Sequence, residues 1–298
     1  MSMSLTDQAN SLRNLLDNFN RSNSPRLNSR VITISSGKGG VGKTNFATNL
    51  AIFFKNAGHE VIVIDADFGL ANIEILLGCA PKYSLIDVLN GNRKIEDVIS
   101  EAPCGVRFIS GGNGLKELAN LSGQQLRHIM EGLTTLDSMA DIILIDTGAG
   151  ISESVINFVK ASRETIIICA PEPTSITDAY SLIKTAHESA INPSELPQFK
   201  IVINRTEDTK EGESIYKNLH RVAEGFLSVK LNYLGSIPYD SDLVRAVKQQ
   251  NPAMLSYPDS NFTKEIIKIG NKLLNRPLPP EKSAGMKGFM KKLAGIFG

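Results

Sequence analysis

A glycine-rich stretch with two lysines, GKGGVGKT from Gly37 to Thr44, has the residue types and spacing best suited to chemistry. It matches the phosphate-binding pattern GxxxxGK[ST], follows an apolar strand-like run and opens a helical pattern, as that motif requires. Its glycines allow successive N–H groups to form an anion-binding nest at a helix N-terminus. Lys43 is expected to reach the β- and γ-phosphates, and Thr44 to offer a hydroxyl to Mg²⁺. The predicted nucleotide-binding residues here are Gly37, Lys38, Gly39, Gly40, Val41, Gly42, Lys43 and Thr44.

Carboxylates end two later apolar runs. Asp65 and Asp67 follow residues 61–64, and Asp146 follows residues 142–145. Because ligands of open α/β folds bind at the carboxyl ends of the strands, these acids are expected to face the phosphate loop. Asp65 and Asp67 could instead serve as turn or cap residues. The interpretation preferred here makes Thr44, Asp65 and Asp146 the ligands of Mg²⁺.

Strand-like and helical patterns alternate from Val31 onward, which favours βαβ units and a parallel sheet. The strand-like runs are 31–35, 60–64, 105–112, 141–145, 165–170, 200–203 and 233–237. Helical patterns follow the phosphate loop as far as Gly58 and recur at 122–136, 174–190, 211–228 and 259–274. The predicted fold class is α/β, a P-loop three-layer sandwich with a mostly parallel central sheet flanked by helices.

Length and composition limit the class of protein. The chain has 298 residues and 42% hydrophobic content, enough for one large core with short appendages. A formal net charge of +1 gives no general sign of nucleic-acid binding, so direct DNA binding is not expected. Cys79, Cys104 and Cys169 form no CxxC pair and are typical of a reducing compartment. With no secretory signal and no apolar run of about 18 residues, we expect a cytoplasmic protein, reversibly bound at the inner face of the membrane.

The expected organisation has three parts: residues 1–29, a domain at 30–275, and residues 276–298. In the first part, residues 5–16 carry a narrow apolar stripe at helical spacing, and residues 17–29 have the composition of a tether. A lone helix of this length is marginal in water, which suggests a segment that folds on a partner. Docking of this helix on its own domain is the alternative.

The C-terminal part reads as a proline-containing linker, 276–283, followed by an amphipathic helix at 286–298. Its apolar residues at helical spacing are Met286, Phe289, Met290, Leu293, Ile296 and Phe297. Lysines on or beside the opposite face give it the profile of a basic interfacial helix, for which an anionic membrane surface is the expected partner. Here too, docking on its own domain is the alternative.

Lys38, directly after the first glycine of the loop, is a residue that an ordinary phosphate loop does not need. With it, the sequence resembles the deviant Walker A ATPases of the MinD/ParA family over residues 31 to about 274. Asp7–Arg13, DQANSLR, resembles the N-terminal segment of one branch, the flagellar number and placement regulators called FlhG, FleN or YlxH. The resemblance implies ATP and ADP as ligands with Mg²⁺, and a homodimer with ATP. It also implies contact with an FlhF-like GTPase of the signal-recognition type through Asp7–Arg13, and a flagellar transcription regulator or switch component as a further candidate partner.

The same resemblance assigns the adenine contacts. Asn204 and Arg205 end one strand-like run, and in the family the equivalent Asn recognises the adenine edge, while the loop with Pro238 and Asp240 packs on the base. Residues 204–207, NRTE, also resemble the guanine signature NKxD. Arg replaces Lys and Glu replaces Asp in that comparison, so ATP is favoured over GTP.

The mechanism that the resemblance suggests is a slow, Mg²⁺-dependent ATPase. Two ATP-loaded subunits close face to face, and Lys38 of each contacts phosphate in the partner's site. Asp67 orients or polarises the attacking water, and Lys43 with the loop amides stabilises charge in transfer. Gly148 and Gly150 allow the mobility that a γ-phosphate sensor needs. The absence of a sequence marker for an added arginine finger suggests slow turnover, suited to a switch.

Three other functions share parts of this pattern. A division-site MinD would share the ATPase and the tail but gives no reason for DQANSLR. A ParA-like DNA-segregating ATPase would be expected to show a basic DNA-binding surface or an added N-terminal domain. An iron–sulfur reductase of the nitrogenase iron-protein type would use two cysteines per subunit at a dimer axis, and Cys104 by itself does not indicate one.

Overall fold

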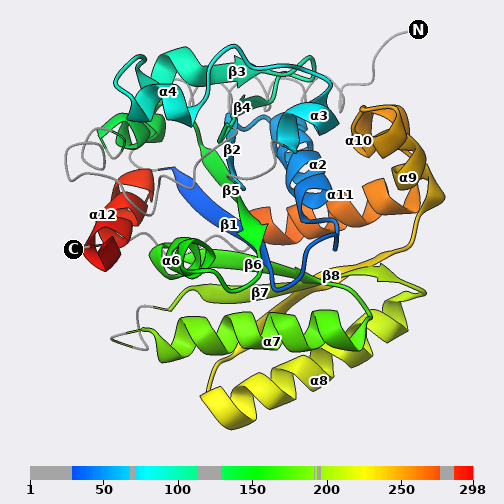
Figure 1. Cartoon of the computed structure of the whole chain (residues 1–298). Helices are drawn as coiled ribbons and strands as arrows, with labels where there is room; N and C mark the ends of the chain where they lie inside the picture. The colour runs from blue at the N-terminus through cyan, green and yellow to red at the C-terminus, as the bar shows by residue number, and fades with distance from the viewer. Residues whose placement is uncertain are drawn as a thin grey trace, which may run out of the picture.

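The computed structural model describes residues 29–67, 72–112, 129, 131–190, 192, 196–275 and 285–297. The predicted N-terminal helix with Asp7–Arg13, the linker 276–283 and most of the predicted helix 122–136 lie outside the described residues, as do the side chains of Ile296 and Phe297. Strands and helices alternate through the described part, which confirms the predicted α/β class (Figure 1).

The described strands form one eight-stranded sheet in the order β3-β4-β2-β5-β1-β6-β7-β8. All neighbouring strands are parallel except β3 and β4, which are antiparallel. The strands are β1 (Arg30–Ser36), β2 (Val61–Ala66), β3 (Ile99–Glu101), β4 (Arg107–Ile109), β5 (Ile142–Ala149), β6 (Glu164–Cys169), β7 (Gln198–Thr206) and β8 (Leu231–Pro238).

Helices cover both faces of this sheet (Figure 1). The α-helices are α2 (Lys43–Asn56), α3 (Ile73–Leu77), α4 (Leu85–Leu89), α6 (Glu153–Ala161), α7 (Pro173–Glu188), α8 (Thr209–Leu227), α9 (Ser241–Lys248), α10 (Ala253–Ser256), α11 (Asn261–Leu274) and α12 (Gly285–Phe297). Two short 3-10 helices are η1 (Ile95–Val98) and η3 (Leu136–Ser138).

The core is layered by the alternation of side chains along the strands. Ile32 and Ile34 of β1 pack with α2 and α11 on one face, whereas Val31 lies on the other face with α12. Further along that second face, α6, α7 and α8 cover β6 and β7. Strands buried on both faces read as continuous apolar runs, which is why the sequence revealed the central strands directly.

Sequence reasoning missed the short elements at the borders of the fold. The edge strand β3 has only three residues, and its Ile99 pairs with Ile109 of β4. Helix α10 has four residues, and α9 has one fully buried residue, Ala246. Segments of this length carry too few apolar positions to show a period.

The C-terminal helix α12 is docked on its own domain, the alternative that the sequence left open. Its buried residues Met286, Phe289, Met290 and Leu293 join the cluster formed by β2, β5 and η1, and the helix packs against α6 and β1 (Figure 1). The ring of Phe289 stacks on Phe158 of α6, with centroids 6.1 Å apart. These four apolar side chains are therefore covered in this state, and their contact with a membrane requires the helix to undock.

Ser29, the last residue of the predicted N-terminal part, is 3% exposed and directly precedes β1. The predicted division at residues 29 and 30 stays a prediction. Of the helices that the structure describes, none combines the length and hydropathy needed to cross a bilayer.

Candidate active site

The phosphate loop runs from the carboxyl end of β1 into α2 and is held between two other elements. Gly42 has φ 93°, and a Cβ there would lie 2.5 Å from Nδ2 of Asn204 on β7. A Cβ on Gly37 would lie 2.2 Å from the backbone of Asp178 on α7. Only glycine fits either position without displacing a neighbour. The two glycines therefore determine where the loop packs as well as its backbone conformation.

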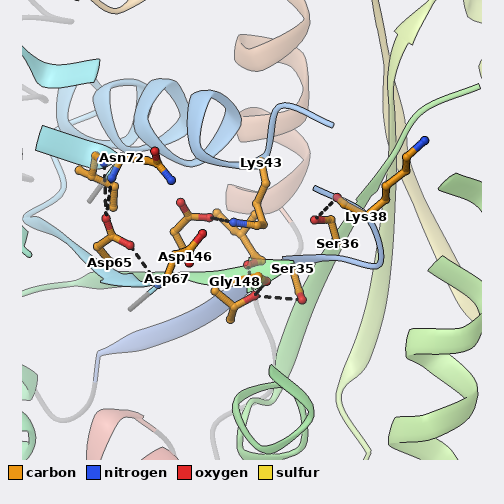
Figure 2. A network of polar contacts seen from close by, with 12 residues as sticks. Ser35, Ser36, Lys38, Lys43, Asp65, Asp67, Asn72, Asp146 and Gly148 are labelled. Atoms are coloured by element: carbon orange, nitrogen blue, oxygen red, sulfur yellow. Dashed lines mark hydrogen bonds and ion pairs between the residues drawn. The ribbon is translucent and has the colours of Figure 1, made fainter. Parts of the chain in front are cut away.

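Lys43, at the first residue of α2, points into the sheet and pairs with Asp146 of β5 (Figure 2). Its Nζ lies 2.9 Å from Oδ1 of Asp146, and both side chains are buried. Burial raises the pKa of Asp146, and the charge and hydrogen bond of Lys43 oppose that rise. Thr44, the next residue, also acts to lower the pKa of this carboxylate. The loop lysine is thus held by the acid at the end of the neighbouring strand.

The other oxygen of Asp146, Oδ2, is buried and has no hydrogen-bond partner among the described residues. An unpaired buried carboxylate oxygen beside a hydroxyl fits a hard cation. The described residues contain no group of three or more His, Cys, Asp or Glu side chains that could hold a metal by themselves. Mg²⁺ at nucleotide sites is usually held by one or two protein groups together with phosphate oxygens and water, so Thr44 and Asp146 suit it.

Asp65 lies directly opposite Asp146 across the parallel pair β2 and β5. Its Oδ1 accepts a hydrogen bond from the backbone N–H of Asp67 at 3.0 Å, and its Oδ2 from the N–H of Asn72 at 3.2 Å. Burial, and next the charge of Asp146, raise the pKa of Asp65 to about 7. The acid therefore holds the backbone at Asp67 and at Asn72, the residue before α3, as in the alternative of a cap residue. Whether it also contacts Mg²⁺ stays a prediction.

This raised pKa predicts how stability depends on pH. Between the ordinary pKa near 4 and about 7, native Asp65 keeps a proton that the unfolded chain has lost. The free energy of unfolding should therefore fall as pH rises through this range, on the order of 4 kcal/mol for a pKa difference of about three. Asp65→Asn removes this titration, so the variant should gain stability relative to wild type from pH 4.5 to 8.

Urea unfolding of the nucleotide-free proteins at several pH values measures this difference. The loss of one acceptor oxygen in the Asn variant adds a constant that does not change with pH. A difference between variant and wild type that is the same at every pH would contradict the assignment.

Asp67 faces the carboxyl end of β5, which leads into the loop that contains Gly150. Its Oδ1 lies 3.7 Å from the place that a Cβ of Gly148 would occupy. The same loop is joined to the phosphate loop, because the N–H of Gly150 donates to the carbonyl of Ser36 at 2.9 Å. Next to it, the hydroxyl of Thr147 lies 3.0 Å from Oγ of Ser35 (Figure 2). Asp67 thus lies close to Gly148, one of the two glycines of the predicted γ-phosphate sensor.

Lys38 points away from Asp146 and the other labelled aspartates (Figure 2) and contacts the start of α7. Its Nζ donates to Glu172 at 2.6 Å and to Thr174 at 3.0 Å. This hydrogen bond lowers the pKa of Glu172. The side chain of Lys38 is 39% exposed, so it remains accessible to another subunit. Sequence reasoning missed Glu172, although Pro171 and Pro173 on either side of it after a strand mark a fixed turn.

Asn204 and Arg205 lie at the end of β7, beside the phosphate loop. Nδ2 of Asn204 donates to the carbonyl of Val41 at 2.7 Å, and the side chain is 3% exposed. This bond fixes the orientation of the amide. Arg205 has φ 64°, a left-handed conformation that is uncommon outside glycine and marks a sharp turn next to a candidate ligand site.

Pro238 ends β8, pairing with Thr206, and Asp240 begins the next helix. Oδ1 of Asp240 accepts from the N–H of Asp242, and Oδ2 from the N–H of Phe262, both at about 2.9 Å. Asp240 thus caps α9 and holds the first turn of α11. The expected contact of Asp240 with the base stays a prediction, and the observed role is to shape the loop.

Comparisons with known proteins agree with this fold. Residues 28–274 match a family model described as ParA, NUBPL iron-transfer P-loop NTPase. The chain is 35% identical to the antiactivator FleN of Pseudomonas aeruginosa, over 89% of this chain and 93% of that protein. It is 33% identical to the flagellum site-determining protein YlxH of Helicobacter pylori, over 99% of this chain and all (100%) of the relative. The solved structure of MinD with Mg-ADP from Pyrococcus horikoshii superposes with a TM-score of 0.67 at 25% identity, covering 82% of this chain and 95% of that one.

Proposed function

Because the chain belongs to the MinD/ParA family of P-loop NTPases and to its FleN/YlxH branch of flagellar number and placement regulators, we propose that it is an ATP-dependent dimerising switch. In this proposal the ATP-bound dimer binds the membrane, and the nucleotide-free or ADP form is a cytosolic monomer. The arm at residues 1–28 stimulates an FlhF-like GTPase. The FleN and YlxH relatives cover nearly the whole chain, which favours this branch over division-site and DNA-segregating relatives.

One observation carries the catalytic part of this proposal: Lys43 is paired with Asp146, whose second oxygen is unpaired among the described residues. When a triphosphate enters the loop, Lys43 can exchange its carboxylate partner for phosphate oxygens. Asp146 and Thr44 are then free to hold Mg²⁺, which would neutralise phosphate charge. A relative solved with Mg-ADP supports a magnesium–nucleotide complex as the ligand.

The remaining residues of the site have separate tasks. Asp67 orients or polarises water, and Asp65 holds the turn that carries it. The fixed amide of Asn204 leaves its carbonyl oxygen to accept from an adenine amino group, which favours ATP. Arg205, Pro238 and Asp240 form the surrounding turn.

Lys38 supplies the link between ATP and dimerisation. In the single chain it is bonded to Glu172 and Thr174 at an accessible surface. We expect these bonds to break when a second subunit approaches, so that Lys38 contacts phosphate in the partner's site. Exposed ion pairs are weak, and the exchange therefore needs little energy.

The C-terminal helix gives the dimer its membrane contact. Helix α6, on which α12 is seated, begins at Glu153, directly after the loop that contains Gly148 and Gly150. A conformational change of this loop on binding the γ-phosphate can therefore shift α6, the helix on which α12 packs. Release exposes the apolar face together with Lys287 and Lys291, and two tails on one dimer raise avidity.

A variant that weakens the packing of α12 on α6 without changing α12 itself tests this release. Phe158→Ala removes the ring that stacks on Phe289, so vesicle binding without nucleotide should rise several-fold. Co-sedimentation with phosphatidylglycerol-containing vesicles measures it. Phe226→Ala is the matched control, because Phe226 is 80% exposed on α8. Binding by the Phe158 variant no higher than that of the control would count against a releasable tail.

The arm is tested by deletion of residues 1–28, which keeps the buried Ser29 in place. ATP hydrolysis should stay within about twofold of wild type, because the site residues all lie at Gly37 or after it. Stimulation of an FlhF-like GTPase should be lost, and a peptide of residues 1–20 should restore part of it. If the deletion abolishes ATP hydrolysis instead, the arm belongs to the folded domain.

A further inference from the structure

The carboxylate of Asp137, in η3, caps the docked C-terminal helix from a distant part of the chain. It accepts hydrogen bonds from the N–H groups of Met286 at 2.7 Å and Lys287 at 2.9 Å, in the first turn of α12. The first N–H groups of a helix have no partner within it, and a negative charge is favourable there. Asp137 therefore does for α12 what an N-cap residue does locally.

The same carboxylate also holds the point where the N-terminal arm joins the domain. Both the N–H and the hydroxyl of Ser29 donate to Oδ1 of Asp137, the oxygen that Met286 also contacts. Ser29 is buried and continues directly into β1. One side chain thus contacts the root of the arm and the start of the tail helix.

The next residue, Arg30, contacts the chain on the other side of the 276–284 segment. Its Nη1 donates to the carbonyl of Leu273, near the end of α11, at 2.7 Å. Its Nε and Nη2 donate to the two carboxylate oxygens of Glu164, both at 2.8 Å. Arg30 is therefore hydrogen-bonded to the chain shortly before residues 276–284. Ser29 is linked, through Asp137, to the chain directly after them.

We propose that Asp137, with Ser29 and the first N–H groups of α12, is a latch that couples the docking of the tail helix to the root of the N-terminal arm. Displacing Ser29 removes two donors that orient the carboxylate, so the cap on α12 weakens. Release of α12 in turn removes two donors and loosens Ser29. Coupling of this kind is reciprocal.

The latch lies at the amino end of β1, whereas the phosphate loop lies at its carboxyl end. With 7 residues in β1 the separation is roughly 20 Å. A partner that engages the arm could thus promote release of the tail without touching the nucleotide. The roles of arm and tail in this statement rest on the proposed function, but the coupling itself does not.

Amide hydrogen exchange of the full-length, nucleotide-free protein tests the latch without a membrane or a partner. Asp137→Asn should speed exchange of residues 286–293 by roughly tenfold, the effect of losing a charged cap. Ser29→Ala, which keeps the Asp137 carboxylate that accepts from Met286 and Lys287, should speed the same amides by about threefold. Ser138→Ala is the matched control, because the hydroxyl of Ser138 donates locally to the carbonyl of Thr135.

The reverse direction uses Phe158→Ala, which loosens the seat of α12 and leaves Ser29 untouched. Exchange of the Ser29 N–H should rise in this variant and stay unchanged in Phe226→Ala. If Ser29→Ala leaves residues 286–293 as protected as in Ser138→Ala, the latch is wrong, even if Asp137→Asn fails to fold. A failure of vesicle binding with intact exchange coupling would contradict the membrane role alone.

Discussion

Asp67→Ala is expected to lower ATP hydrolysis by at least about 100-fold while leaving ATP affinity within a few-fold of wild type. Asp67 faces Gly148 across the site, whereas Lys43 of the phosphate loop pairs with Asp146. Its loss should therefore remove the group that handles water and keep the groups that hold phosphate. Phosphate release, together with binding of a fluorescent ATP analogue, measures the two quantities.

Asp259→Ala is the control for this variant, since Asp259 is an exposed acid in the turn before α11. That protein should hydrolyse ATP at the wild-type rate. Hydrolysis by Asp67→Ala within a few-fold of the control would contradict the role given to Asp67. A parallel loss of ATP affinity would instead place Asp67 among the binding residues.

Lys43→Ala and Lys38→Ala are expected to differ more than any other pair of like substitutions in this chain. Lys43→Ala removes the contact to phosphate and leaves the buried Asp146 without its cation. Nucleotide affinity should fall by at least about 100-fold, and the free energy of unfolding by about 3–5 kcal/mol. Lys38→Ala breaks only contacts at an accessible surface, so both affinity and stability should stay near wild type.

Calorimetric titration with ATP and urea unfolding separate these two variants. The Lys38 variant should bind ATP but fail to dimerise. If both variants lose ATP affinity equally, Lys38 acts within its own subunit. If Lys43→Ala is as stable as wild type, the buried pair with Asp146 does not hold the nucleotide-free site together.

The role of a residue could be predicted from the sequence where its contacts are with residues close to it in the chain or follow from a known pattern. The phosphate loop is a local motif, and Asp65 and Asp146 each follow a strand-like run, so their meeting across β2 and β5 could be predicted. Glu172 could not, because its contact with Lys38 joins residues 134 apart in the chain. The bond that Asp240 accepts from the N–H of Phe262 likewise joins residues 22 apart in the chain.

The tail shows a second limit of sequence reasoning. An amphipathic helix with apolar residues at the spacing of Met286, Phe289, Met290 and Leu293 fits a membrane surface and a protein groove equally well. In this state α12 is docked because α6 and β1 offer it an apolar surface and Asp137 caps it. None of these residues is close to α12 in sequence. The same helix can serve both surfaces in turn, which is what the proposed cycle requires.

The central claim is that ATP joins two subunits through Lys38. The most direct test is the mass in solution, by light scattering with saturating ATP and Mg²⁺, of Asp67→Ala and of the double variant Asp67→Ala, Lys38→Ala. Both should bind ATP without hydrolysing it, so only the contact of Lys38 differs between them. The account predicts a dimer for the single variant and a monomer for the double variant. A dimer of equal stability in both, or a monomer in both, would contradict it.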